Sequence, residues 1–221
     1  MKKAIVLLSG GIDSATTLYV AKKKGFAPSA LIFDYGQRQR KEIESAKKIA
    51  KKARCPYRIV RLPFFWKGSS LLDSKVPVPV NRSFNSIGRG IPSTYVPARN
   101  LVFLCIAASF AESTRTRAIF IGAHTQDFSG YPDCRKVFFE AFKKVLTAGT
   151  KDGSKIEVFT PLIDKNKEEI IKIGLRLNVP YRMTWSCYKG GKRPCGICDS
   201  CIIRARGFKE AGIADPYFGS S

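Results

Sequence analysis

The residues best suited to bind a ligand lie near the amino end, where the sequence reads SGGIDS from Ser9 to Ser14. This stretch lies between a strand pattern and a helix pattern, a position that falls at the carboxyl edge of a parallel sheet, where ligands bind. Two glycines let the backbone turn tightly toward an anion, and the serines add hydroxyl donors. The amino end of the following helix contributes free N–H groups and a positive dipole. We therefore predict a phosphate-binding loop.

The loop differs from a Walker A motif, because no Gly-Lys-Ser/Thr follows the glycines. Asp13 would repel phosphate unless it binds Mg²⁺ or caps the helix. The alternative interpretation is an ordinary glycine-rich turn with Asp13 or Ser14 as the helix N-cap. The strand pattern before the loop and the helix pattern after it favour phosphate binding.

A second chemical cluster lies near the carboxyl end, where four cysteines fall within fifteen residues: Cys187, Cys195, Cys198 and Cys201. Glycines between them allow the tight turns of a metal knuckle, so one structural Zn²⁺ per chain is the leading interpretation. An iron–sulfur cluster is the chief alternative, although its fourth cysteine usually lies downstream rather than upstream. The third interpretation is a set of reduced thiols that bind no metal.

Composition limits the class of protein. The 221 residues include 39 Lys and Arg against 17 Asp and Glu, a formal net charge of +22 that favours polyanionic partners. A hydrophobic content of 44% is enough for the core of one sizeable domain. Seven cysteines, an odd number, argue against a secreted disulfide framework.

Neither export nor a membrane segment is expected. The apolar run after Lys3 stops at Ser9, which is short for a secretory signal. The longest apolar stretch, 101–111, is shorter than the ~18 residues that cross a bilayer. We expect a soluble, cytoplasmic protein.

Strand and helix patterns alternate along the chain, which predicts an α/β fold with a doubly wound, mostly parallel sheet. We predict strands at 4–8, 30–33, 57–61, 118–121 and 156–159, and helices at 14–24, 38–53, 101–110, 135–146 and 167–177. Asn166 and Glu169 form a plausible capping box for the last of these helices.

The predicted organisation is an ATP-binding domain over 1–180 and a cysteine-rich, zinc-binding subdomain with a C-terminal helix over 181–221. Residues 62–97 contain five prolines and form a long insertion, a type of loop that is usually functional. Cys55 and Cys105 are expected in the core. The helix at 135–146 presents an apolar stripe of the kind that packs on a core, formed by Val137, Phe138, Ala141, Phe142 and Val145.

The loop resembles that of the PP-loop ATP pyrophosphatases, which hold the pyrophosphate of ATP while the α-phosphate is attacked. Four further blocks narrow the resemblance: FDYGQR (33–38), YVPARN (95–100), SGYPDCR (129–135) and TWSC (184–187). Together, in this order, they resemble the 7-cyano-7-deazaguanine synthases, the QueC family, over almost the whole chain. Each block is weak alone, but jointly they are highly specific.

The resemblance implies an adenine nucleotide alpha hydrolase-like fold and an ATP-dependent ligase in the queuosine and archaeosine tRNA modification pathway. This family converts 7-carboxy-7-deazaguanine and ammonia to 7-cyano-7-deazaguanine. The implied route passes through an acyl adenylate, an amide and an adenylated amide, with Mg²⁺ offsetting the phosphate charge. A homodimer is also implied.

The resemblance also assigns roles to residues. Catalytic roles fall on Ser9, Asp13, Ser14 and Arg99, where Arg99 would neutralise phosphate or the substrate carboxylate. The four cysteines become zinc ligands. The ATP-binding residues are Leu8, Ser9, Gly10, Gly11, Ile12, Asp13, Ser14, Ala15, Thr16, Thr17 and Leu18, with Asp34, Gln37 and Arg38 expected near the adenosine.

The substrate is expected to contact Tyr131, Asp133 and Arg135. Tyr131 would stack on the deazapurine and Asp133 would pair with its N–H edge, unless Asp133 caps the helix that begins near Arg135. For His124, the only histidine, a structural or supporting role is favoured over a proton shuttle. Cys134 is expected to be a packed pocket thiol, because adenylate chemistry with ammonia needs no protein thiol.

Two other functions compete with this one. A PP-loop enzyme that adenylylates a tRNA base directly is favoured by the charge, but the chain lacks an appended RNA-binding fold. A non-enzymatic zinc-knuckle nucleic-acid binder leaves the PP-loop unexplained. Direct nucleic-acid binding is therefore not expected, although the basic charge leaves it open.

Overall fold

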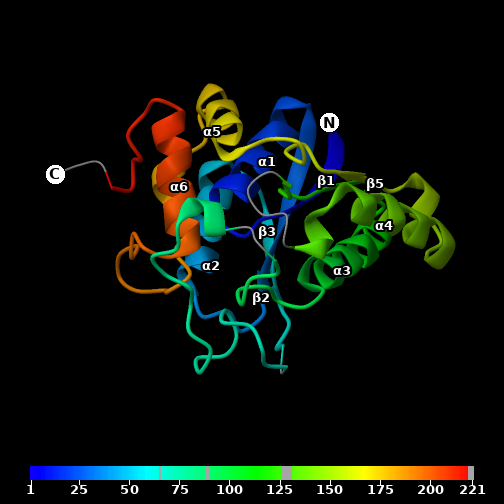
Figure 1. Ribbon diagram of the computed structural model, residues 1–221. Coiled ribbons are helices and arrows are strands. Elements are labelled where there is room, and N and C mark those ends of the chain that lie inside the picture. The colour runs from blue at the N-terminus through cyan, green and yellow to red at the C-terminus, as the bar shows by residue number, and fades with distance from the viewer. Residues whose placement is uncertain (65, 88–89, 126–130, 219–221) are drawn as a thin grey trace.

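The computed structural model describes residues 1–64, 66–87, 90–125 and 131–218. Its centre is a five-stranded sheet in the order β3-β2-β1-β4-β5 (Figure 1). Each strand pairs in parallel with its neighbours, which confirms the predicted doubly wound α/β sheet. The strands are β1 (Lys2–Leu7), β2 (Phe26–Asp34), β3 (Tyr57–Arg61), β4 (Ala118–Phe120) and β5 (Glu157–Phe159).

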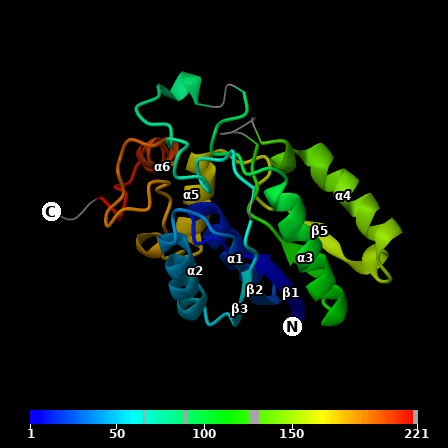
Figure 2. The ribbon, with the colours of Figure 1, turned by 90° about the horizontal axis from the view of Figure 1, so that it is seen from below.

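Helices cover both faces of this sheet, and each predicted helix is present within a few residues of its predicted bounds. Figure 2 shows α3 and α4 on one side of the sheet, with α1, α2 and α5 on the other. Among the described residues, no helix is both long enough and apolar enough to span a membrane. The helices are α1 (Ile12–Lys23), α2 (Lys41–Lys52), α3 (Arg99–Ser113), α4 (Lys136–Gly149), α5 (Lys167–Arg176) and α6 (Asp199–Glu210).

The side chains on the two faces of β1 pack in two separate hydrophobic cores. Val6 packs in the core beneath α1, α2 and α5, whereas Ile5 and Leu7 pack in the core beneath α3 and α4. Because both faces of the strand are buried, the strand reads as a continuous apolar run rather than as an alternating pattern. The strand that precedes the predicted loop is therefore packed on both of its faces.

Two predictions about burial are wrong. Helix α4 buries Phe139, Phe142 and Leu146, while Val137 and Val145 are 65% and 56% exposed. The helix is rotated toward its larger aromatic side chains, which bury more apolar surface. Cys105 lies on the exposed side of α3, whereas Cys55 is buried as expected.

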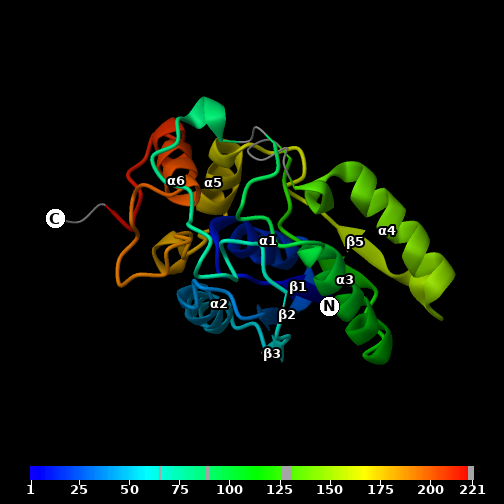
Figure 3. The same ribbon diagram turned by 60° about the horizontal axis from the view of Figure 1, so that its bottom comes forward.

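The insertion at 62–97 runs to the cysteine-rich segment, and Figure 3 shows its short helix, η1 (Phe84–Ser86), beside α6. Val80 forms an antiparallel bridge with Cys198, and Arg82 makes two hydrogen bonds of 3.1 and 2.8 Å to Asp199. Helix α6 packs against α5, and its Phe208 lies in the core beneath α1. The boundary at residue 180 stays a prediction.

Candidate active site

A cavity of about 260 Å³ lies at the carboxyl ends of β1, β2 and β4. From β1 the chain proceeds outward to β2 and β3 on one side, and later to β4 and β5 on the other. The cavity therefore lies at the topological switch point, where open α/β sheets bind ligands. Its lining includes Ser9 and residues 11–14 of the loop, together with residues from α2, α3, α5 and α6.

Gly10 shapes the loop that follows β1. Its φ is +92°, a conformation that L side chains rarely adopt, and a Cβ there would overlap the Glu42 carbonyl oxygen of α2. Glycine thus lets the loop pack directly on the first turn of α2. This contact brings the Glu42 side chain to the cavity.

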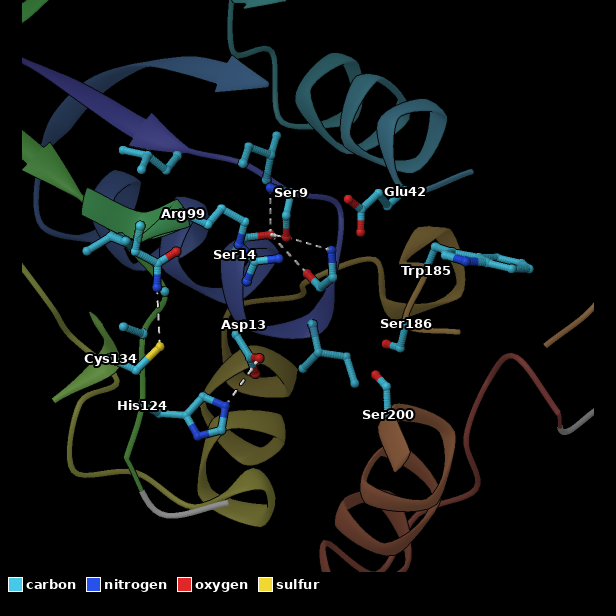
Figure 4. A pocket seen from close by; sticks show the side chains of 18 of the residues that line it. Ser9, Asp13, Ser14, Glu42, Arg99, His124, Cys134, Trp185, Ser186 and Ser200 are labelled. Atoms are coloured by element: carbon cyan, nitrogen blue, oxygen red, sulfur yellow. Dashed lines mark hydrogen bonds and ion pairs between the residues drawn. The ribbon is translucent and has the colours of Figure 1, made fainter. Parts of the chain in front are cut away.

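The loop's donors converge on one point. The N–H groups of Ser9 and Gly10 both donate to the Ser14 hydroxyl oxygen at 3.2 Å, and the Ser9 hydroxyl lies 3.0 Å from it (Figure 4). The N-cap of α1 is Gly11, so the proposed capping by Asp13 or Ser14 is wrong. An acceptor with more charge than a hydroxyl, such as a phosphate oxygen, suits these converging donors.

Asp13 is held by two basic side chains. Its carboxylate lies 2.7 Å from Lys167 Nζ and 3.4 Å from His124 Nε2, and Lys167 Nζ lies 3.1 Å from His124 Nε2. Burial alone would raise the pKa of Asp13, but Lys167 and His124 outweigh burial and hold that pKa well below its usual value. The lysine side chain is only 10% exposed, so an ammonium group is fixed beside the loop.

Arg99, the first residue of α3, enters the cavity from the opposite core. Its guanidinium donates to the Tyr35 hydroxyl at 3.1 Å. Burial alone would lower the pKa of Arg99, but the neighbouring Tyr35, Tyr131 and Glu42 raise it by a larger amount. The net pKa lies above its ordinary value, so the guanidinium stays charged. Burial raises the pKa of Tyr35 to about 12, which keeps its hydroxyl neutral.

Glu42 provides a second carboxyl group, on the Ser9 side of the loop in Figure 4. Its Oε1 accepts a hydrogen bond of 3.0 Å from Gln37 Nε2. Burial raises the pKa of Glu42 to about 7, although Arg99 and the amides of Gln37 and Gln39 oppose this shift. The cavity thus contains one carboxylate that is paired with a lysine and one whose pKa lies near neutral pH.

The four predicted metal ligands come together at the start of α6, where Cys198 is the N-cap and Cys201 lies in the first turn. The sulfurs of Cys187, Cys195, Cys198 and Cys201 all lie within 4.8 Å of one another, and those of Cys195 and Cys201 are 4.0 Å apart. Tetrahedral Zn–S bonds of about 2.3 Å require sulfur separations of about 3.8 Å, so the cluster fits zinc. N–H groups of Cys195 and Cys198 also point at cluster sulfurs, at 3.4 and 3.3 Å.

A family model described as queuosine biosynthesis protein QueC matches residues 3–212. The chain belongs to the QueC family. This confirms the resemblance inferred from the sequence blocks. Two relatives are named 7-cyano-7-deazaguanine synthase. The Thermoplasma volcanium protein is 50% identical over 217 residues, covering 97% of this chain and 90% of the relative. The Acetivibrio thermocellus protein is 48% identical over 219 residues, covering 97% and 96%.

A solved structure, NMN synthetase from Francisella tularensis, has a similar fold. Its TM-score is 0.52 at 14% identity, covering 96% of this chain and 78% of that one. At this identity the likeness concerns the fold alone. It supports the α/β class expected for a PP-loop protein of the QueC family.

The structure places the predicted QueC ATP-binding residues in several different environments. Leu8, Ser9 and 11–14 line the cavity, whereas 15–18 are buried in α1. Asp34 lies in a separate surface hollow with Arg61. Three residues remain: Gly10 packs on α2 and does not line the cavity, Gln37 donates to the Phe33 carbonyl and to Glu42, and Arg38 donates to the Asp73 carbonyl. The predicted adenosine contacts of Asp34, Gln37 and Arg38 stay predictions.

Of the predicted substrate residues, Tyr131 lines the cavity and Asp133 and Arg135 do not. Asp133 accepts a hydrogen bond of 2.9 Å from the Asn100 N–H, so it satisfies the first turn of α3 rather than that of α4. Arg135 is exposed at the start of α4. Residues 129 and 130 of the SGYPDCR block lie outside the described residues.

His124 and Cys134 both line the cavity. His124 contacts Asp13 and Lys167, in keeping with the supporting role expected for it. The Cys134 sulfur lies 3.2 Å from Asn100 Nδ2. Burial and the neighbouring Asp133 raise the pKa of Cys134 to about 12, which disfavours a thiolate nucleophile and agrees with a packed thiol.

Sequence reasoning missed Lys167, Glu42 and Gln39 as cavity residues. A signal existed for Lys167, because the capping box places a lysine in the first turn of α5, where the helix dipole disfavours a cation. A lysine at this position predicts an acidic side chain nearby that stabilises its charge. No comparable signal existed for Glu42 or Gln39, since both belong to a lysine-rich stretch typical of a solvated helix.

Proposed function

We propose that this chain is an ATP-dependent ligase that converts 7-carboxy-7-deazaguanine and ammonia to 7-cyano-7-deazaguanine. The observation that supports it best is the single cavity that gathers the loop donors, the Asp13–Lys167 pair and Arg99. Membership of the QueC family, together with relatives named for this synthesis, supports the substrate.

The loop and Lys167 would act on ATP. A carboxylate oxygen leaves poorly at neutral pH, so it must first be activated. It is activated by forming a bond to the α-phosphorus of ATP, from which pyrophosphate departs. The converging N–H groups of Ser9 and Gly10 suit the pyrophosphate that departs, and Lys167 adds positive charge beside them. Once the amide has formed, a second ATP would activate the amide oxygen in the same way. That oxygen would then depart with AMP, and the nitrile would remain.

Magnesium is part of this proposal. Mg²⁺ commonly binds one or two carboxylates together with substrate phosphates. Asp13 fits this role, because its carboxylate is 28% exposed, lies in the loop and faces the cavity. Bound Mg²⁺ would supply charge neutralisation on the phosphates.

The substrate end of the cavity would be formed by Arg99 and Tyr131. Arg99 keeps its charge and reaches the carboxylate as a bidentate donor. The Tyr131 ring lies 5.7 Å from that of Tyr95, and its hydroxyl is 2.7 Å from Thr94. These contacts fix an aromatic face that suits stacking on a deazapurine.

Zinc would hold the cysteine-rich segment and thereby brace the loop. The Trp185 N–H donates to the Gly10 carbonyl at 2.9 Å, and the Trp185 indole donates to the Cys187 carbonyl at 2.9 Å. Two hydrogen bonds of Trp185 therefore connect the cysteine cluster to the loop. We assign zinc a structural role, with one ion per chain.

A homodimer and a cytoplasmic location complete the proposal. Val137 and Val145, exposed on α4, offer a second copy an apolar surface. Sedimentation of the purified protein tests the dimer.

The decisive assay supplies the purified protein with 7-carboxy-7-deazaguanine, ATP, Mg²⁺ and ammonium. We expect the nitrile, with about two AMP and two pyrophosphate per nitrile and the amide as an intermediate. Supplying the amide should consume about half as much ATP. Absence of nitrile would refute the substrate, and a nitrile formed with ADP and phosphate would refute the role of the loop.

A further inference from the structure

Glu42 is a cavity carboxyl group that has no ion-pair partner among the described residues, although the charge of Arg99 acts on it from a longer distance. In the described part of the chain, no Lys, Arg or His lies within ion-pair distance of it, whereas Asp13 contacts both Lys167 and His124. Its Oε1 accepts one hydrogen bond from Gln37, which leaves further acceptor capacity on the carboxylate. The position suits a small cation.

Gln39 places a second acceptor on the same wall. The residue is 2% exposed and lines the cavity, and its side-chain amide opposes the effect of burial on the pKa of Glu42. The amide oxygen, Oε1, is buried and has no hydrogen-bond partner among the described residues. A buried acceptor left in this state costs about 1–3 kcal/mol, so a donor from a ligand fits here.

A ligand for these two acceptors must be small, positively charged and rich in hydrogen-bond donors. Ammonium has four N–H donors and no acceptor, and it is the form in which ammonia mostly exists at neutral pH. We propose that Glu42 and Gln39 bind ammonium, and that the Glu42 carboxylate removes its proton to release ammonia inside the cavity. This inference rests on the proposed function, because it supplies the nucleophile for the amide-forming step.

One N–H bond of ammonium breaks and its proton moves to the Glu42 carboxylate. The nitrogen lone pair then forms a C–N bond with the acyl carbon, and the C–O bond to AMP breaks with its electron pair on AMP. The second proton lost by nitrogen goes to the departing phosphate, and Glu42 returns its proton to water. Burial, which raises the pKa of Glu42 to about 7, makes it a stronger base than an exposed carboxylate.

The test separates ammonium use from ATP activation. Glu42→Gln should raise the KM for ammonium by about ten- to hundredfold, as expected for loss of a charged hydrogen bond. Exchange of labelled pyrophosphate into ATP, measured with the deazapurine acid and no ammonium, should stay near the wild-type rate. Gln39→Met should raise the KM less, because the carboxylate remains.

Hydroxylamine provides a rescue, because it is mostly uncharged at neutral pH and needs no base. Glu42→Gln should form the hydroxamate at nearly the wild-type rate. Glu44→Gln removes an exposed carboxyl of the same helix, paired with Lys47, and should change none of these values.

Several results would overturn the inference. They are an unchanged KM for ammonium, loss of pyrophosphate exchange together with ammonium use, or failure of hydroxylamine to rescue. Competition by potassium as strong as the binding of ammonium would instead show a general cation site. If the wild-type protein shows no exchange that depends on the deazapurine acid, the proposed function itself fails.

Discussion

One cluster of reactive side chains lies in the loop after β1 and another at the start of α6, and they differ in what their neighbours do. In the cysteine cluster four sulfur atoms face one another, and together they could hold a metal ion. In the loop cluster Asp13 already has an ion pair with Lys167 and a contact with His124. The first arrangement thus offers four ligand atoms to one ion, whereas the second has partners within the protein.

This difference predicts which property each cluster controls. Removing a cysteine should affect folding first and activity as a consequence. Removing a loop residue should affect activity with little effect on folding. The Trp185 hydrogen bond to Gly10 connects the two, so metal loss should also loosen the loop.

The largest expected effect is that of Cys198→Ser. Structural zinc sites contribute about 10 kcal/mol or more to folding, so this variant should fold poorly and bind little metal. Elemental analysis of the wild-type protein should find about one zinc per chain, and the purified protein should be colourless. A brown protein with stoichiometric iron would contradict the assignment.

A smaller loss is expected where α6 meets the C-terminal segment. Asp215 bonds to Arg204 at 2.6 and 2.8 Å, and both side chains are less than a tenth exposed. Asp215→Ala should lower the free energy of unfolding by about 3–5 kcal/mol, because it leaves a buried charge unpaired.

The control for this variant is Glu168→Ala, which removes a partly exposed pair with Lys172. It should change the free energy of unfolding by less than about 1 kcal/mol. Equal losses in denaturant titrations of the two variants would show that burial of the Arg204 pair has no special importance.

Loop variants should behave in the opposite way. Asp13→Ala and Ser14→Ala should lower turnover by about 10²–10³-fold while the chain stays folded by circular dichroism. Lys167 and His124 keep the pKa of Asp13 below its usual value, and this outweighs burial, so the loss should be similar from pH 5 to 8. Near-normal turnover in both variants would remove the loop from the mechanism.

The smallest effect expected is a pH-dependent gain in stability for Glu42→Gln. The folded-state pKa of Glu42, about 7, lies above its ordinary value of 4.5, so the wild-type protein loses stability as pH rises through 7. Arg99 and Tyr35 face the same carboxyl group and remain ionised and neutral, respectively, in this range. The variant should therefore exceed the wild type in Tm at pH 8, and by less at pH 5. The same difference in Tm at both pH values would show that Glu42 ionises normally.

The fold was largely accessible from sequence because it depends on local signals. The capping box of Asn166 and Glu169 is present with both hydrogen bonds, and the strand at 57–61 has the predicted bounds. The loop and the four cysteines were found because their residue types are unusual and closely spaced.

The rest of the site depends on contacts between distant segments. Asp13 and Lys167 are 154 residues apart, and no local pattern pairs them. Glu42 reaches the cavity only because Gly10 lets the loop pack on α2. Helix α4 shows the same limit, since its apolar periodicity allowed two faces and packing chose the one with Phe139 and Leu146.

The central claim is that this cavity activates an oxygen of the substrate by cleaving ATP at the α-phosphate. The most direct test labels both carboxyl oxygens of 7-carboxy-7-deazaguanine with a heavy stable isotope and follows the label by mass spectrometry. We predict that each AMP released contains one labelled oxygen and that the amide intermediate keeps one. Label found in inorganic phosphate or in water, with unlabelled AMP, would contradict the account.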